Sequence, residues 1–144
     1  MTRFWITIDQ GINLVAKSFS RMIGGEIFVP IIPSIRIVDL AKAMAPNLEQ
    51  KIIGIRPGEK IHEVMCSKDD ALNVIKFKDY YLIAPNIKLS KNNKIFLKNK
   101  LNGSGKMVEQ NFEYNSGTNE KFLSVKEIKK VNLRNNLEWY LIVG

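Results

Sequence analysis

The sequence has very few of the residues that build metal centres, disulfides or membrane spans. It contains a single cysteine, Cys66, and a single histidine, His62, among 144 residues. One cysteine excludes a disulfide within the chain, and no cysteine or histidine spacing is typical of zinc. No apolar run approaches the ~18 residues of a membrane span. The amino terminus shows no basic-then-apolar leader, so we expect no metal, no membrane and a cytoplasmic location.

Acidic residues are scarce relative to basic ones. There are 22 lysines and arginines against 14 aspartates and glutamates, which gives a formal net charge of +8. This charge favours anionic partners such as nucleotide-sugars, nucleic acid or acidic lipid headgroups. Much of the excess lies between Lys88 and Lys106, among asparagines. Because such a run is more typical of a solvated surface than of a binding stripe, we expect no specific nucleic-acid binding.

The first predicted helix is amphipathic and begins at a capping box. Thr7 followed by Gln10 has the spacing of that motif. One helical face then extends to about Arg21, formed by Ile8, Ile12, Val15, Ala16 and Phe19. Gly24-Gly25 is expected to end the helix.

Strands and helices alternate up to residue 65, which predicts an α/β fold rather than a helical bundle. The expected strands are residues 26–29, 51–55 and 80–84, and the expected later helices are 38–44, 59–65 and 125–131. Ser124 and Glu127 form a capping box for the last helix. The helix at 38–44 has no good cap, so Ser34 or Asp39 must serve or the helix frays.

Residues 86–111 carry no core signal and are predicted to form a flexible connector rich in asparagine, lysine and glycine. This divides the chain into an α/β segment at 1–85, the connector, and a tail at 112–144 with one helix. The apolar stretch 137–143 has no assigned place in this scheme.

The most informative stretch extends from Ile52 to Met65 and is predicted to be a strand, a turn and a helix. Pro57-Gly58 supplies the turn, Arg56 ends the strand, and Glu59 begins the helix. A guanidinium offers a fork matched to phosphate, and amides at a helix start also favour anions. Glu59 would suit the helix dipole and could accept hydrogen bonds from a sugar hydroxyl. On pattern alone, Arg56 could equally be a solvated charge and Glu59 a helix-start residue.

Several segments together resemble the inverting UDP-N-acetylglucosamine 4,6-dehydratases. These are lyases of the extended short-chain dehydrogenase/reductase superfamily that open the pseudaminic acid route. The matching segments, in the family's order, are Met1–Thr7, Gly24–Pro30, Asp39–Asn47, Ile52–Met65 and Tyr114–Asn119. The resemblance implies the substrate-side carboxyl-terminal portion of that fold, with an irregular α+β tail.

The resemblance also implies roles for individual residues. The family's Arg-Pro-Gly-Glu contacts to the nucleotide diphosphate map onto Arg56 and Glu59, and Arg3 is a weaker substrate-binding candidate. The expected partners are a UDP-sugar and a missing amino-terminal cofactor-binding half, and a homo-oligomer is left open.

The catalytic parts of the family have no counterpart in this sequence. NADP is expected in the full-length enzyme, but Gly103-Ser104-Gly105 lies in a polar connector, with Val108 where a third glycine belongs. The superfamily's Tyr-x-x-x-Lys is missing, because the residues four positions after the tyrosines are Ala84, Pro85, Thr118 and Gly144. His62 is expected to be structural or solvated, and Cys66 inert. We therefore predict no catalytic, cofactor-binding or metal-binding residue.

The sequence thus predicts a nucleotide-sugar-binding carboxyl-terminal fragment of such a dehydratase, in bacterial surface-sugar synthesis, that is inactive alone. The alternatives are a non-catalytic basic binding module or a non-functional remnant derived from that enzyme.

Overall fold

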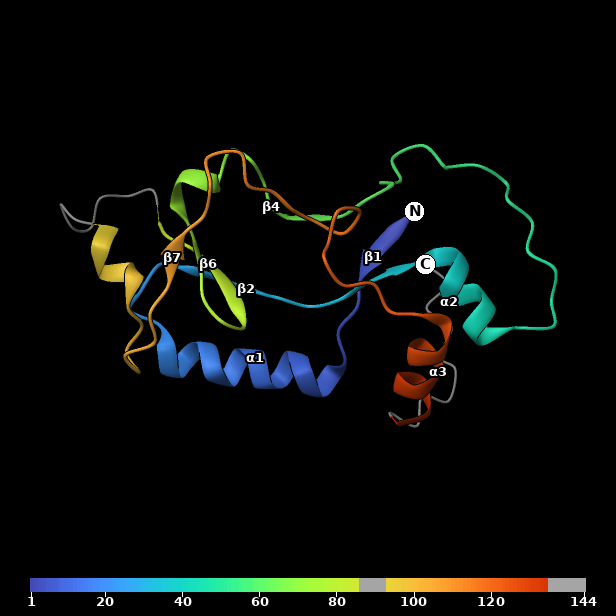
Figure 1. Ribbon diagram of the computed structural model, residues 1–144, viewed down its shortest axis with the longest axis horizontal. Coiled ribbons are helices and arrows are strands. Elements are labelled where there is room, and N and C mark those ends of the chain that lie inside the picture. The colour runs from blue at the N-terminus through green and yellow to red at the C-terminus, as the bar shows by residue number, and fades with distance from the viewer. Residues whose placement is uncertain (86–92, 135–144) are drawn as a thin grey trace.

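The computed structural model describes residues 1–85 and 93–134, which form an elongated arrangement of short sheets and helices (Figure 1). The helices are α1 (Ile8–Arg21), α2 (Ile37–Met44) and α3 (Val125–Arg134), with short 3-10 helices η1 (Ala71–Asn73) and η2 (Asn93–Leu97). The strands are β1 (Thr2–Phe4), β2 (Ile27–Pro30), β3 (Ser34–Arg36), β4 (Val64–Cys66), β5 (Val74–Lys76), β6 (Tyr80–Ile83), β7 (Lys106–Met107) and β8 (Tyr114–Asn115).

One end of the molecule is built on an antiparallel sheet with the strand order β2-β6-β5-β7. Successive side chains of a strand point to opposite faces, so Tyr80 and Leu82 of β6 enter one core cluster while Tyr81 enters another. The first cluster also holds Ile75, Phe77, Ala84 and Phe96, and the second holds Val29, Cys66, Val74 and Tyr114. Helix α1 lies along this end of the molecule (Figure 1).

The other end is built on the antiparallel pair β1-β3, with α2 and α3 packed against each other. Its core is the fully buried pair Ile35 and Ile128 together with Leu123. The pair β4-β8 lies between the two ends, and Cys66 and Tyr114 of this pair belong to the second core cluster. The molecule is therefore stabilised by several small clusters rather than one large core.

Most locally encoded elements are confirmed. Thr7 and Gln10 form the reciprocal capping box of α1, and Ser124 accepts a hydrogen bond from the Glu127 amide at the start of α3. β2, α2 and β6 also lie where they were predicted. Helix α1 ends at Arg21, ahead of the positive-φ residues Gly24 and Gly25. The mixed α and β content is confirmed, and the strand pairs within the sheets are antiparallel.

Neither predicted cap of α2 forms. Its N-cap residue is Arg36, and no side chain caps it; Asp39 instead lies 3.7 Å from the Arg36 guanidinium. Ser34 is fully buried, and its hydroxyl receives a hydrogen bond from Asn119. At the start of α2, the Ile37 amide donates to the Met1 carbonyl over 3.2 Å, and the helix as a whole packs against α3.

The predicted strand at 51–55 and helix at 59–65 are wrong. Residues 45–63 contain no helix or strand, and Ile52 and Ile53 are 86% and 76% exposed. A strand needs a hydrogen-bonded neighbour, and none of the described strands pairs with this run. Val64–Cys66 pairs with β8 instead of closing a helix, because strand pairing overrides a weak local helical pattern.

The expectation of no core residue between 86 and 111 is also wrong. Phe96 of η2 is 7% exposed and belongs to the cluster of Phe77 and Tyr80, and β7 pairs with β5. Residues 86–92 and the apolar stretch 137–143 lie outside the described residues. The three-part division of the chain stays a prediction.

Among the helices that the structure describes, none combines the length and apolarity needed to cross a membrane. The described residues also contain no cluster of histidine, cysteine, aspartate and glutamate able to hold a metal ion.

Candidate functional site

The Arg56–Glu59 segment is a tight turn closed at both ends. The Glu59 amide donates to the Arg56 carbonyl over 3.1 Å, and the Arg56 amide donates to Glu59 Oε2 over 2.9 Å. Pro57 and Gly58 occupy the central positions, and Gly58 has a φ of +84°. Proline followed by a residue with positive φ is the pattern of a type II turn, so the predicted turn is confirmed.

The turn presents Arg56 differently from the expected strand end. Arg56 and Glu59 are exposed on the long loop, and no helix follows them. The contribution expected from a helix dipole is therefore absent. Within the described residues, the Arg56 guanidinium forms no ion pair. It is thus available to an anionic ligand, whereas one Glu59 oxygen already holds the turn.

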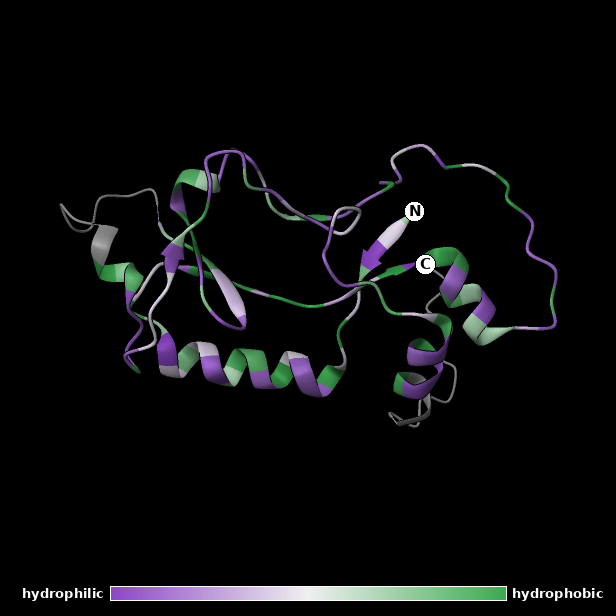
Figure 2. Ribbon diagram, in the orientation of Figure 1, coloured by the Kyte–Doolittle hydropathy of each residue, from purple (hydrophilic) through white to green (hydrophobic). Residues whose placement is uncertain are grey.

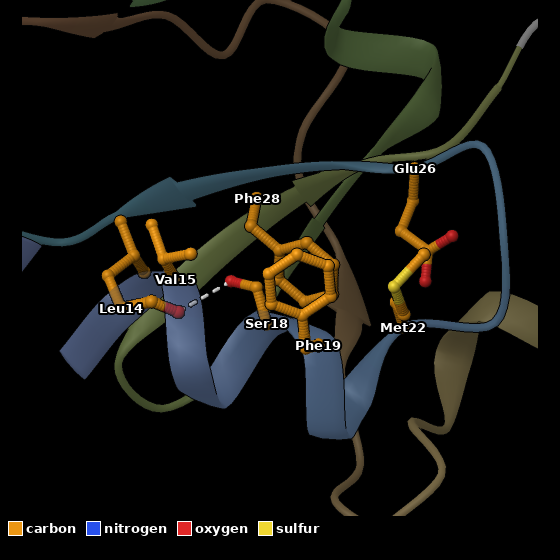
Figure 3. Close-up of a pocket in the computed structure, with 7 residues that line it drawn as sticks. All are labelled: Leu14, Val15, Ser18, Phe19, Met22, Glu26 and Phe28. Carbon is orange, nitrogen blue, oxygen red and sulfur yellow. Dashed lines mark hydrogen bonds between the residues drawn. The ribbon is translucent and has the colours of Figure 1, made fainter. Parts of the chain in front are cut away.

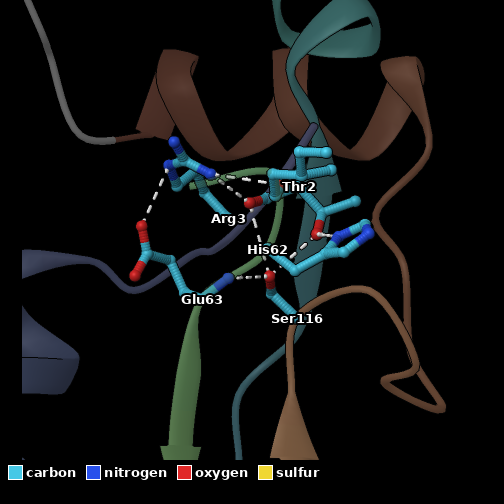
Figure 4. A network of polar contacts seen from close by, with 6 residues as sticks. Thr2, Arg3, His62, Glu63 and Ser116 are labelled. Atoms are coloured by element: carbon cyan, nitrogen blue, oxygen red, sulfur yellow. Dashed lines mark hydrogen bonds and ion pairs between the residues drawn. The ribbon is translucent and has the colours of Figure 1, made fainter. Parts of the chain in front are cut away.

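Arg3 lies at the carboxyl end of this loop rather than beside Arg56. Its Nη1 donates to the Thr2 carbonyl over 2.7 Å and makes a longer 3.5 Å contact with the Ile61 carbonyl. Its Nε lies 3.4 Å from a carboxylate oxygen of Glu63 (Figure 4). The Thr2 amide also donates to the Ile61 carbonyl. The geometry therefore places Arg3 where it holds the loop, and leaves its predicted substrate contact as a proposal.

A polar network centred on the buried hydroxyl groups of Thr2 and Ser116 completes this attachment. Thr2 Oγ1 lies 2.8 Å from His62 Nδ1 and 2.8 Å from Ser116 Oγ. Ser116 Oγ accepts a hydrogen bond from the Glu63 amide over 2.8 Å (Figure 4). Ser116 is fully buried and Thr2 is 6% exposed. Buried polar groups of this kind need their partners, so the network fixes the exit of the loop to β1 and to the segment after β8.

Gly117 explains how the two segments come so close. A Cβ at this position would lie 2.5 Å from His62 Nδ1, which is closer than real Cβ contacts allow. The structural reading of His62 is supported by these contacts, although His62 lies outside any helix.

The same segment also fastens the chain between β2 and β3. Tyr114 Oη accepts from the Ile32 amide and donates to the Ile32 carbonyl, both over 2.9 Å. Asn119 Nδ2 donates to the Ile32 carbonyl and to Ser34 Oγ. Residues 114–119 therefore hold the connection between β2 and β3 in place through hydrogen bonds. No local pattern in the sequence indicates this role, although the segment is one of those that resemble the dehydratases.

The Gly103–Gly105 segment does not have the structure of a dinucleotide-binding turn. Gly105 packs so closely that a Cβ there would lie 2.5 Å from Ile75 and 2.7 Å from Phe77. Its amide donates to the Leu97 carbonyl, and the strand β7 rather than a helix follows. Gly103-Ser104-Gly105 therefore serves close packing, not the cradling of a pyrophosphate at a helix start.

Cys66 is fully buried in β4, where burial and then the nearby Asp70 carboxylate raise its pKa to about 12. The thiol is therefore inert at neutral pH, as the sequence predicted. In the unfolded chain the pKa of a cysteine is about 8.5. Above that pH the unfolded state loses the proton that the folded state keeps, so stability should fall as pH rises toward 12.

We expect urea unfolding of the chain to show falling stability between about pH 8 and pH 10. Cys66→Ala should flatten that slope, at the cost of some overall stability from the lost side chain. Tyr81, whose pKa burial also raises to about 12, would contribute only at higher pH. Equal slopes for both proteins would contradict the assignment to Cys66.

Comparisons with known proteins agree with the resemblance. Residues 1–85 match the family described as "Polysaccharide biosynthesis protein". The chain is 48% identical over 131 residues to a UDP-N-acetylglucosamine 4,6-dehydratase (inverting) of Campylobacter jejuni, covering 91% of this chain and 39% of that protein. It is 37% identical over 87 residues to a UDP-glucose 4-epimerase of Rickettsia canadensis, covering 58% of this chain and 26% of the epimerase.

The fold is also similar to that of a solved protein. The structure of Pen from Bacillus thuringiensis matches with a TM-score of 0.73 and 24% identity, over 94% of this chain and 39% of the other. At this identity the likeness shows the fold alone. The chain spans about 39% of the length of the Campylobacter relative. Because the family match covers residues 1–85 of 144, the chain belongs to the polysaccharide biosynthesis protein family.

Proposed function

We propose that this chain is the carboxyl-terminal, substrate-side portion of an inverting UDP-N-acetylglucosamine 4,6-dehydratase that acts in bacterial surface-sugar synthesis. The observation that carries the proposal is the 48% identity to the Campylobacter jejuni enzyme across 91% of this chain. The exposed turn supports it, because the Arg56 guanidinium forms no ion pair with the described residues and a nucleotide diphosphate is an anion of matching geometry.

In this proposal Arg56 binds the diphosphate of the UDP-sugar. Glu59 has two tasks, since one oxygen closes the turn and the other can accept a hydrogen bond from a sugar or ribose hydroxyl. Arg3 contributes mainly by holding the end of the loop through Ile61 and Glu63. A direct contact between Arg3 and the substrate is the weaker part of the site assignment.

The hydride chemistry belongs to the portion of the enzyme that this chain does not span. Dehydration of a nucleotide-sugar requires a dinucleotide, here NADP, that takes up a hydride and returns it. We propose that this portion also supplies the acid and base side chains. The reaction would be cytoplasmic, because a charged UDP-sugar does not cross a lipid bilayer unaided.

A chimera tests the function. This chain replaces the matched portion of the Campylobacter jejuni dehydratase, and the formation of a 4-keto-6-deoxy sugar from UDP-N-acetylglucosamine is measured. We expect the chimera to form the product, and the chain alone to form none and to bind no NADP. A folded but inactive chimera that binds no UDP would favour the non-catalytic module. Product formed by the chain alone would contradict the assignment of the hydride chemistry to the portion that this chain does not span.

A further inference from the structure

The loop that carries Arg56 is held at its two ends rather than along its length. Residues 51–60 are all exposed, Ile52 and Ile53 to 86% and 76%, so apolar packing does not hold them. Figure 2 shows this loop as an extended length of chain in which apolar and hydrophilic residues are mixed. Within the described chain, the hydrogen bonds of residues 51–60 all lie in the Arg56–Glu59 turn. The position of Arg56 therefore depends on what fixes the chain on either side of it.

The two ends of the loop are not held equally. Before the turn, the exposed Gln50 side chain donates from Nε2 to the Val38 carbonyl over 3.3 Å. After the turn, the Glu63 amide donates to Ser116 Oγ and the Ser116 amide donates to the Glu63 carbonyl, both over 2.8 Å. Thr2 Oγ1 lies 2.8 Å from the same Ser116 oxygen. The attachment at the carboxyl end is therefore the stronger one.

The hydroxyl groups of Thr2 and Ser116 are at the centre of this attachment. Thr2 is 6% exposed and Ser116 is fully buried, so bulk water cannot replace a lost partner of either group. Thr2 Oγ1 also lies 2.8 Å from His62 Nδ1, which adds a second contact to the loop (Figure 4). Removal of either hydroxyl would leave buried polar groups unpaired and would weaken the hold on residues 61–63.

A hydroxyl at the other end of the molecule makes only a local bond. Ser18 Oγ donates to the Leu14 carbonyl one turn earlier in α1, in the wall of an apolar groove of about 260 Å³ between α1 and β2 (Figure 3). Thr2 and Ser116, by contrast, lie 114 residues apart, and they join β1, the loop and the segment after β8. Of these three hydroxyls, only those of Thr2 and Ser116 reach the loop that carries Arg56.

We propose that the hydroxyls of Thr2 and Ser116 are positioning groups of the UDP-sugar site and act through the loop on the Arg56 guanidinium; this rests on the proposed function. With Ile61 held, Arg56 is five residues from a fixed point and stays within about 17 Å of it, because a chain spans at most about 3.5 Å per residue. With that end released, the next fixed residue is Val64 of β4, and the reach grows to about 28 Å.

This confinement bears on affinity because an ordered arginine loses less conformational entropy when it binds an anion. A released loop would have to be ordered again each time the diphosphate binds. The inference gives residues 114–119 a part in substrate binding, exerted at a distance, in addition to their hold on the connection between β2 and β3.

Calorimetric titration of the chimera with UDP tests the inference. Ser116→Ala should raise the dissociation constant about threefold to tenfold, because binding must then order the released loop. Ser34→Ala is the matched control, since Ser34 is equally buried and its hydroxyl contacts Asn119 of the same segment. Within the described residues, the hydrogen bonds of Ser34 do not reach the loop, so its dissociation constant should stay within about twofold of wild type.

A double-mutant cycle shows whether Ser116 acts through Arg56. In the Arg56→Ala background, Ser116→Ala should change the dissociation constant by less than about twofold, because no guanidinium is left to position. A purely structural role predicts the same added loss in both backgrounds, and that result would overturn the inference.

Thr2 provides a second pair of variants. Thr2→Val keeps the shape of the side chain but loses the hydroxyl, so it should weaken UDP binding as Ser116→Ala does. Thr2→Ser keeps the hydroxyl and should bind UDP nearly as well as wild type. Equal affinities of Thr2→Val and Thr2→Ser would contradict a role for the hydroxyl.

Amide hydrogen exchange reports on the loop without any ligand. Peptides covering residues 52–63 should exchange faster in Ser116→Ala and Thr2→Val than in wild type and Ser34→Ala. Equal exchange in all four proteins, or faster exchange with unchanged UDP affinity, would overturn the inference. Weaker binding by Arg56→Ala alone would remove this inference and leave the proposed function standing, whereas a folded chimera that binds no UDP would remove both.

Discussion

Arg56→Ala is expected to weaken UDP binding by the chimera by about 1.5–3 kcal/mol, the usual contribution of a hydrogen bond to a charged group. This corresponds to roughly a tenfold to hundredfold rise in the dissociation constant. Arg56→Lys should restore only part of the loss, because an ammonium keeps the charge but loses the planar fork. Glu59→Gln should cost less, since an amide oxygen can still accept from the Arg56 amide and from a hydroxyl. The measurement is calorimetric titration with UDP.

Folding controls separate binding from stability. Arg56 is exposed, and no described residue pairs with its guanidinium, so Arg56→Ala should change the free energy of unfolding by no more than about 0.5 kcal/mol. The effect should appear mainly in substrate affinity, because the diphosphate is remote from the reacting carbon. Equal dissociation constants for wild type and Arg56→Ala would remove Arg56 from the site. A lower melting temperature with unchanged affinity would make the residue structural.

Ile35→Ala is expected to destabilise the chain by about 2–5 kcal/mol, the range for truncating a buried isoleucine. Ile35 is fully buried in β3 and packs with Leu123 and Ile128. Few other residues fill this cluster, so the lost side chain leaves a cavity that neighbours cannot readily close. Because β3 pairs with β1, the loss should also loosen Thr2 and Arg3 at the base of the loop.

Ile27→Ala is the matched control for this prediction. It makes the same substitution in a strand, but Ile27 is 60% exposed, so we expect a change of about 0.5 kcal/mol or less. Urea unfolding followed by circular dichroism compares the two variants with wild type. Similar midpoints for Ile35→Ala and Ile27→Ala would mean that the cluster around Ile35 does not form in solution.

The sequence by itself determined the elements whose signals are local. The capping boxes at Thr7 and Ser124 lie within one helical turn of the residues that they cap, so α1 and α3 were predictable. The turn at Arg56–Glu59 was likewise predictable, since proline and a glycine with positive φ specify it over four residues. The candidate ligand-binding arginine therefore follows from sequence and resemblance, although the strand and helix expected around it do not form.

Only the tertiary structure decided how that turn is held and which surfaces remain open. Thr2 meets His62 and Ser116 across separations of 60 and 114 residues, so no local pattern could reveal the network. Val64–Cys66 forms a strand rather than a helix because it pairs with β8, a segment about fifty residues away. The periodicity of α1 identified an apolar face but not its direction, because direction depends on which other contacts the helix makes. Here the ion pair and ring contact of Arg21 turn a less apolar side toward the sheet and leave Ile8, Ile12, Val15 and Phe19 facing solvent.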